Sequence, residues 1–260
     1  MNTAEHEMGR RWLAKRGRPV ATPTPYLEAL LATRNVRPRS ALPWFLLFVV
    51  LGLFGAVGYQ SLFGMTAAAA AYFVCFVIQL TMWRSIRARQ RELAKRTRPW
   101  PGATRDRGVL GGWFAVAVVL AYAGGAALAV ALLSTAPAYA WSWLGLLALS
   151  AICGGVVLAG FTRGPVLAED PESLAVYRGL LAENIHSASP ALVAVPPLLD
   201  VALGHRFPAA YVPALIAYVV LVVAVELTAY VRNRRPLPPG HYGDPLPSRT
   251  AVDWSPPEGR

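Results

Sequence analysis

Two apolar stretches joined by one glycine decide the fold. Leu42–Phe63 (LPWFLLFVVLGLFGAVGYQSLF) is followed by Gly64 and then by Met65–Trp83 (MTAAAAAYFVCFVIQLTMW). Each is close to the length of about 20 apolar residues that a helix needs to cross a bilayer core about 30 Å thick. The next stretch, Arg84–Gly108, carries nine Arg and Lys residues. The pattern predicts a helical hairpin that crosses a membrane, turns at Gly64, and returns to a basic side.

Four further apolar segments extend this pattern. They are Val109–Leu133, Trp141–Phe161, Ala188–Leu203 and Tyr211–Val231. The chain is 55% hydrophobic, above the share of about 45–50% that is typical of soluble domains. We therefore expect an all-α fold, a polytopic transmembrane helix bundle with six spans.

The fifth segment differs from the other five. It is shorter and contains three prolines and an acid, namely Pro190, Pro196, Pro197 and Asp200. Proline removes a helix donor and clashes with the preceding turn, so we expect a kinked fifth span. The alternative is that this segment dips into the membrane and returns on the same side.

The positive charges indicate the orientation. Of 25 Lys and Arg residues, 24 lie before Leu42, in Arg84–Arg107, at Arg163 and Arg178, or after Val231. Because Lys and Arg stay in cytoplasmic loops, we expect the protein to lie in a bacterial plasma membrane with both termini on the cytoplasmic side. This favours six crossings over five, which would place the basic tail outside. The expected parts are a cytoplasmic arm over 1–41, a transmembrane domain over 42–231, and a Pro-rich cytoplasmic tail over 232–260.

Three segments outside the spans have expected structures. Thr24 and Pro25 are typical of a helix start and predict a short amphipathic helix to Thr33, lying on the inner membrane surface. Asp170-Pro171 predicts a second, interfacial helix to about Ile185, which either docks a partner or closes the mouth of the bundle. The tail from Arg232 is rich in Pro and Gly and is expected to be disordered.

The two acids inside apolar spans are the candidate functional residues. Glu226 in the sixth span costs about 2–3 kcal/mol to insert, so it faces a cavity or a partner, or it reaches the inner headgroups and pairs with Arg232. Asp200 in the fifth span either lines a transport path or pairs with Arg206 at the outer surface.

Candidate contacts for a cytoplasmic partner lie in two loops. The basic loop provides Arg87, Arg89 and Arg91, and the helix after the fourth span provides Asp170 and Glu172. Small residues also recur at helical spacing and predict packing seams, either within one chain, which we expect, or between two chains. These seams are Gly52, Gly55 and Gly58 in the first span, Ala117, Ala121, Gly125 and Ala129 in the third, and Ala151, Gly155 and Ala159 in the fourth.

Motifs for catalysis, phosphate binding and metal binding are missing from the sequence. It contains no Gly-x-Ser-x-Gly, no His-Glu-x-x-His and no Gly-x-x-x-x-Gly-Lys-Ser/Thr run. Cys75 and Cys153 lie within apolar runs and are expected to be buried apolar residues. We expect no enzyme activity, no cofactor and no metal. The basic groups flank spans, which favours anionic lipid over nucleic acid.

The layout resembles two groups of membrane proteins. It is similar to uncharacterised six-span integral membrane proteins of high-GC bacteria, which implies a membrane scaffold or accessory subunit at an anionic inner surface. It also resembles the permease subunit of ABC-2 type exporters, in which a helix precedes the first span. That resemblance implies a separate cytoplasmic ATPase that contacts Arg84–Gly108, and a broken region over Ala188–Pro208.

Overall fold

Six long helical segments form the body of the protein. The computed structural model describes residues 3–34, 38–63, 67–102, 111–204 and 207–246. Within these residues, six segments are long and apolar enough to cross a membrane, which confirms the expected helical class and the number of candidate spans. The turn expected at Gly64 lies outside the described residues.

Some of these segments are single helices and others consist of several pieces. The first, second and fourth are α3 (Pro38–Phe63), α4 (Ala67–Ala94) and α7 (Pro137–Thr162). The third joins α5 (Gly111–Val119), the π-helical turn η2 (Leu120–Gly124), α6 (Gly125–Ala131) and η3 (Leu132–Ser134). The fifth joins α8 (Pro171–His186), α9 (Ala191–Ala194) and α10 (Pro196–Ala202), and the sixth joins η4 (Ala209–Tyr211) and α11 (Val212–Asn233).

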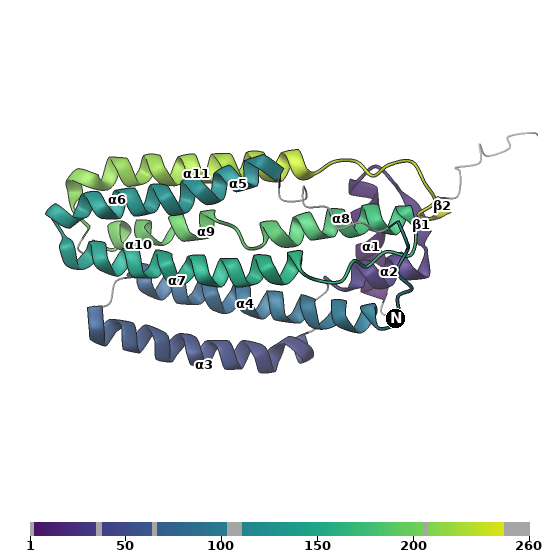
Figure 1. Ribbon diagram of the computed structural model, residues 1–260, viewed down its shortest axis with the longest axis horizontal. Coiled ribbons are helices and arrows are strands. Elements are labelled where there is room, and N and C mark those ends of the chain that lie inside the picture. Colours follow the sequence, from purple (N-terminus) through teal and green to yellow (C-terminus); the bar gives the residue numbers. More distant parts are fainter. Residues whose placement is uncertain (1–2, 35–37, 64–66, 103–110, 205–206, 247–260) are drawn as a thin grey trace, which may run out of the picture.

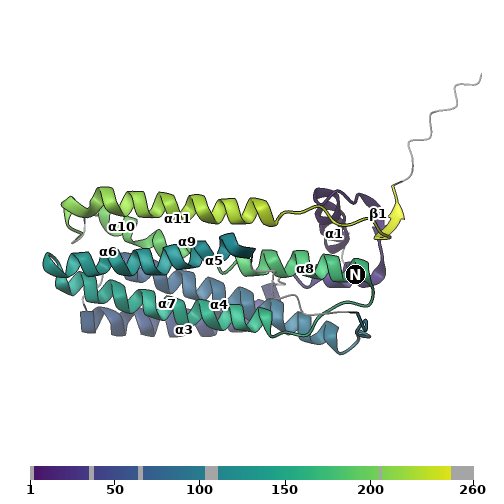
Figure 2. The ribbon, with the colours of Figure 1, turned by 45° about the horizontal axis from the view of Figure 1, so that its top comes forward.

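The long helices run side by side along the long axis of the molecule (Figures 1 and 2). α3 lies at one edge and packs chiefly on α4, where Gly52 and Gly55 face Val77 and Phe73. An added Cβ would come within 2.9 Å of Val77 at Gly52 and within 2.7 Å of Phe73 at Gly55. The expected seam in the first span therefore packs within the chain at these two glycines.

The seams of the third and fourth spans differ. Ala117, Ala121 and Ala129 are fully buried, as expected for an intramolecular seam. Gly155 is exposed, and an added Cβ there would meet nothing within 4 Å. The expectation of an intramolecular seam is therefore wrong at Gly155, because none of the described helices covers it.

α8 begins as the sequence predicts but lies differently. Asp170 is its N-cap and accepts a hydrogen bond from the Ser173 backbone N–H at 2.6 Å. α8 runs in the same direction as the spans and lies in line with α9 and α10 (Figure 1), so the interfacial placement is wrong. The physical reason is burial on several sides, since Leu174, Val176 and Leu180 are all covered by other elements.

The two ends of the chain fold together at one end of the bundle. We call residues 3–34 with residues 234–246 the terminal cap. It contains α1 (Thr3–Lys15), β1 (Val20–Pro23), α2 (Pro25–Ala32) and β2 (Gly243–Pro245), and β1 pairs antiparallel with β2. The tail is thus ordered as far as residue 246, contrary to expectation, because Leu237 and Tyr242 are buried in the core. Residues 247–260 lie outside the described residues.

α2 begins where the sequence predicts, but its apolar side chains do not lie in the predicted environment. The Thr24 hydroxyl accepts a hydrogen bond from the Leu27 N–H at 3.4 Å, which caps the helix as expected. Leu27, Leu30 and Leu31 are only 2%, 1% and 5% exposed. Their stripe packs inside the protein, where α1 and α8 lie against α2, and does not face a membrane surface.

Candidate functional site

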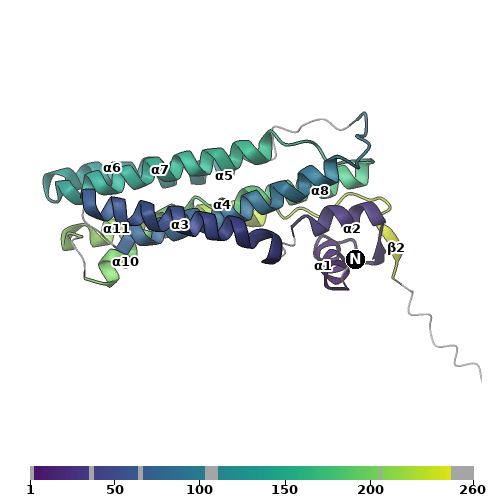
Figure 3. The same ribbon diagram turned by 90° about the horizontal axis from the view of Figure 1, so that it is seen from below.

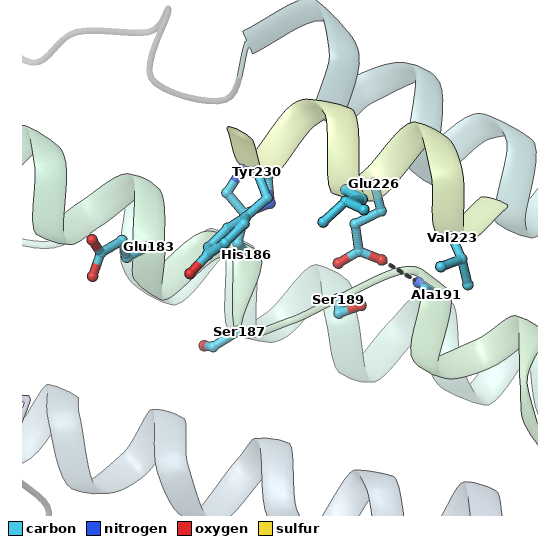
Figure 4. A pocket seen from close by; sticks show the side chains of 9 residues that line it. Glu183, His186, Ser187, Ser189, Ala191, Val223, Glu226 and Tyr230 are labelled. Carbon is cyan, nitrogen blue, oxygen red and sulfur yellow. Dashed lines mark hydrogen bonds between the residues drawn. The ribbon is translucent and has the colours of Figure 1, made fainter. Parts of the chain in front are cut away.

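Glu226 of α11 faces the interruption between α8 and α9. Its carboxylate accepts a hydrogen bond from the Ala191 N–H at 2.8 Å, and the Ser189 side chain lies beside it (Figure 4). The alternative partner, Arg232, instead places its guanidinium over the Trp113 ring at 4.7 Å. The acid therefore satisfies the backbone of an interrupted span instead of pairing with that arginine.

A cavity of about 390 Å³ lies next to this carboxylate. Its floor is the connection between α8 and α9, and its walls come from α8 and α11 (Figure 4). The side chains that line it are Glu183, His186, Ser187, Ser189, Ala191, Val223, Glu226, Leu227 and Tyr230. The sequence identifies Glu226 but does not predict the cavity beside it, because the residues opposite Glu226 are 35 to 43 positions away in the chain.

His186 forms part of the wall and is held by three groups. Its Nε2 accepts a hydrogen bond from the Asn233 side-chain amide N–H at 2.8 Å. Its ring packs edge-to-face against Phe114 and Tyr230, with centroid distances of 5.1 and 5.8 Å. The buried Nδ1 has no hydrogen-bond partner among the described residues. One ring nitrogen thus fixes the orientation of the ring, and in the neutral imidazole the other nitrogen carries the proton and can only donate.

Glu183 connects the cavity to the terminal cap. Its carboxylate accepts hydrogen bonds from Trp12 Nε1 at 3.1 Å and from Arg16 at 2.6 Å, and it forms a further ion pair with Arg34. Burial lowers the pKa of Arg16 and the pKa of Arg34 below the ordinary value for arginine, yet both remain charged. A single acid of α8 therefore joins three side chains of the cap.

Asp200 does not line the cavity beside Glu226 and lies elsewhere in the bundle. It is completely buried, and its two oxygens accept hydrogen bonds from the Ala68 N–H at 2.9 Å and from the Tyr139 hydroxyl at 2.8 Å. It thereby caps the start of α4 and ties α4 to α7 and α10. Its expected partner, Arg206, lies outside the described residues. These two contacts give Asp200 a structural role.

The candidate cytoplasmic contacts are not all on the surface. Arg91 is exposed, but Arg87 is only 9% exposed and donates to Gln90 at 3.3 Å. Arg89 donates to the Ala32 carbonyl at 2.7 Å and joins α4 to the cap. Asp170 caps α8. Of the proposed three arginines, Arg91 is therefore exposed, Arg89 is partly exposed and Arg87 is buried.

Glu172, the remaining candidate contact, lies against the tail. An added Cβ at Gly240 would come within 2.6 Å of the Glu172 side chain. Only a glycine leaves room for this approach, so Glu172 packs where the tail passes α8.

Comparison with protein-family models, curated proteins and solved structures finds no match to this chain. The chemistry must therefore be argued from the side chains. A carboxylate beside a cavity that two serine hydroxyls also line can hold a proton or a small cation. Among the described residues, no group of three or more His, Cys, Asp or Glu side chains is arranged to hold a metal ion.

Proposed function

We propose that the protein is a membrane scaffold or accessory subunit of a bacterial plasma membrane, with both termini cytoplasmic. In this proposal the terminal cap lies at an anionic inner surface and contacts a partner there. The observation that carries the proposal is the cap itself, in which residues from both ends of the chain pair as β1 and β2 and pack on α8. A chain that only fills the bilayer has no need of such a unit.

Exposed basic side chains around the cap support contact with an anionic surface. Each Lys or Arg near such a surface contributes about 1 kcal/mol of attraction. Arg84 lies over the Trp44 ring at 4.4 Å, which is typical of a pair at the edge of a bilayer. The exposed basic residues on this side of the molecule are Arg11, Lys15, Arg91, Lys95, Arg96, Arg98, Arg163, Arg232, Arg234 and Arg235.

α8 gives the cap a physical route to the membrane domain. Glu183, near its C-terminal end, binds the cap and also lines the cavity at Glu226. A partner that moves α1 or α2 would therefore act on α8 and on the interrupted fifth segment directly. This supports an accessory subunit that responds to its partner.

Hydrogen–deuterium exchange in nanodiscs tests the contact with lipid. In discs that contain phosphatidylglycerol, we expect slower exchange over residues 91–98 and over α1 than in discs of phosphatidylcholine alone. Added salt should reduce the difference, because the charges are exposed. Replacing Arg91, Lys95 and Arg98 together by Gln should abolish it. Equal exchange in the two kinds of disc would reject the proposed surface.

The second candidate is the permease subunit of an ABC-2 type exporter. The observation that favours it is the interruption between α8 and α9 opposite Glu226, since interrupted spans beside an acid are typical of transport sites. Purification in gentle detergent from the native host should then recover an ATPase with the chain. Repeated purification without an ATPase would remove this candidate.

A further inference from the structure

A second cavity, of about 560 Å³, lies where the cap meets α3 and α4. α1 and α2 lie beside the end of the bundle where α3 begins (Figure 3). The polar and aromatic side chains that line the cavity are Glu5, Thr33, Trp44, Ser85, Arg89, Glu92 and Arg96. Neither Glu226 nor any residue that lines the cavity beside it lines this second cavity.

Ser85 indicates that the cavity accepts a polar ligand. It is 6% exposed, and its buried hydroxyl has no hydrogen-bond partner among the described residues. A serine in a membrane helix usually donates to the carbonyl one turn earlier. Leaving such a group unpaired costs about 1–3 kcal/mol. A ligand that bonds to this hydroxyl would recover that cost.

The charges on the wall select the kind of ligand. Arg89 and Arg96 are balanced by Glu5 and Glu92, so the formal charge of the lining is zero. The Arg89 guanidinium is fixed by its hydrogen bond to the Ala32 carbonyl. Glu92 pairs with Lys95 at 2.9 Å and with Arg96 at 3.4 Å, and all three side chains are exposed, so a ligand can replace these pairs at little cost. A lining of both signs complements a zwitterion better than an anion.

The position of the cavity indicates that the ligand comes from the membrane. Trp44 stands at the start of the first span, and Arg84 lies over its ring. The adjoining surface of α3 is apolar and uncovered, with Phe45 44% and Leu46 52% exposed. Acyl chains can pack along this surface while a headgroup occupies the cavity.

We propose that this cavity binds the headgroup of a zwitterionic phospholipid with a primary amine, as in phosphatidylethanolamine. The lipid phosphate accepts hydrogen bonds from Ser85, Arg89 and Arg96, and the ammonium group lies between Glu5 and Glu92. The proposal needs only that the chain is embedded in a bilayer, and it does not depend on the scaffold or permease role.

Native mass spectrometry of the purified protein tests the site. Phosphatidylethanolamine and phosphatidylglycerol with identical acyl chains are added in equal amounts. We expect the protein to retain phosphatidylethanolamine about tenfold better, the equivalent of one charge-assisted hydrogen bond. Soluble phosphoethanolamine should not displace it. Equal retention of both lipids, or displacement by the soluble amine, would overturn the proposal.

Two substitutions and a control assign the effect to the cavity. Ser85→Ala should reduce retention about fivefold without lowering the melting temperature, because the hydroxyl has no hydrogen-bond partner among the described residues. Glu92→Gln should move the preference toward phosphatidylglycerol. Arg11→Gln, an exposed residue of α1 outside this cavity, should change neither quantity. Unchanged lipid preference in both Ser85→Ala and Glu92→Gln would also overturn the proposal.

Discussion

At the scale of single residues, two acids that line one cavity hold different parts of the molecule. Glu183 holds the terminal cap through Trp12, Arg16 and Arg34, and Glu226 holds the first residue of α9. The sequence identifies Glu226 because a charge within an apolar run is costly. It does not distinguish Glu183 from its neighbouring acids, because its partners lie about 150 to 170 residues earlier in the chain.

Removing the charge of Glu183 should detach the cap. We expect Glu183→Gln to leave two buried or partly buried arginines short of a counter-charge and to lower the stability of the cap by about 3 kcal/mol. Limited proteolysis should then cleave residues 3–34 faster while the spans stay intact. Glu169→Gln is the matched control, because Glu169 is exposed on the same side of the molecule. Equal cleavage of the two variants would contradict the assignment.

At Glu226, we expect a hydrogen-bond acceptor to matter more to folding than a negative charge. Glu226→Gln retains an oxygen that can accept the Ala191 N–H, so its melting temperature should remain close to that of the parent. Glu226→Leu leaves that N–H unpaired and should cost about 1–3 kcal/mol. Thermal unfolding in detergent compares the two. A large loss in the Gln variant would show that the charge itself holds the fold.

At the scale of elements, the sequence predicts what local pattern determines. Apolar length predicts the six segments, and Thr24 and Asp170 predict the starts of α2 and α8. The sequence does not predict the pairing of β1 with β2, because two strands of three or four residues carry almost no periodic signal. It also does not predict η2, the π-helical turn of the third span. That turn depends on a contact with α11.

η2 is stabilised by a hydroxyl from another helix. A π-helical turn disturbs the regular helical hydrogen bonds, and the Tyr218 hydroxyl donates to the Ala121 carbonyl within it. Gly125 makes room for this contact, since an added Cβ would lie 2.8 Å from the Tyr218 hydroxyl oxygen. The small-residue seam of the third span therefore leaves room for the Tyr218 side chain and also allows the helices to pack closely.

A double-mutant cycle tests this pairing. Gly125→Ala should lower stability by about 1–3 kcal/mol through overpacking, and Tyr218→Phe by a similar amount through an unpaired carbonyl. In the double variant the clash with the hydroxyl oxygen is absent, so the total loss should be less than the sum. Gly155→Ala is the control and should be neutral or slightly stabilising, because nothing lies within 4 Å. Strictly additive losses would contradict the proposed contact.

At the scale of the whole molecule, the chain consists of a helical bundle with one folded unit at one end. Tail residues close onto the N-terminal arm, since the Leu237 N–H donates to the Arg16 carbonyl at 3.0 Å. α8 continues from this unit into the interrupted fifth segment (Figure 1). Residues 3–34 and 234–246 therefore lie at the same end of the bundle, as the proposed orientation with both termini cytoplasmic needs.

Paired cysteines in the cap test this central claim most directly. Thr22 and Asp244 are partners across β1 and β2, so Thr22→Cys and Asp244→Cys in a chain without Cys75 and Cys153 should form a disulfide on oxidation. In intact cells, a membrane-impermeant thiol reagent should label neither cysteine until the membrane is opened. The single-cysteine variants control for reactivity. Labelling of either cysteine from outside, or failure of the pair to form a disulfide after opening, would contradict the account.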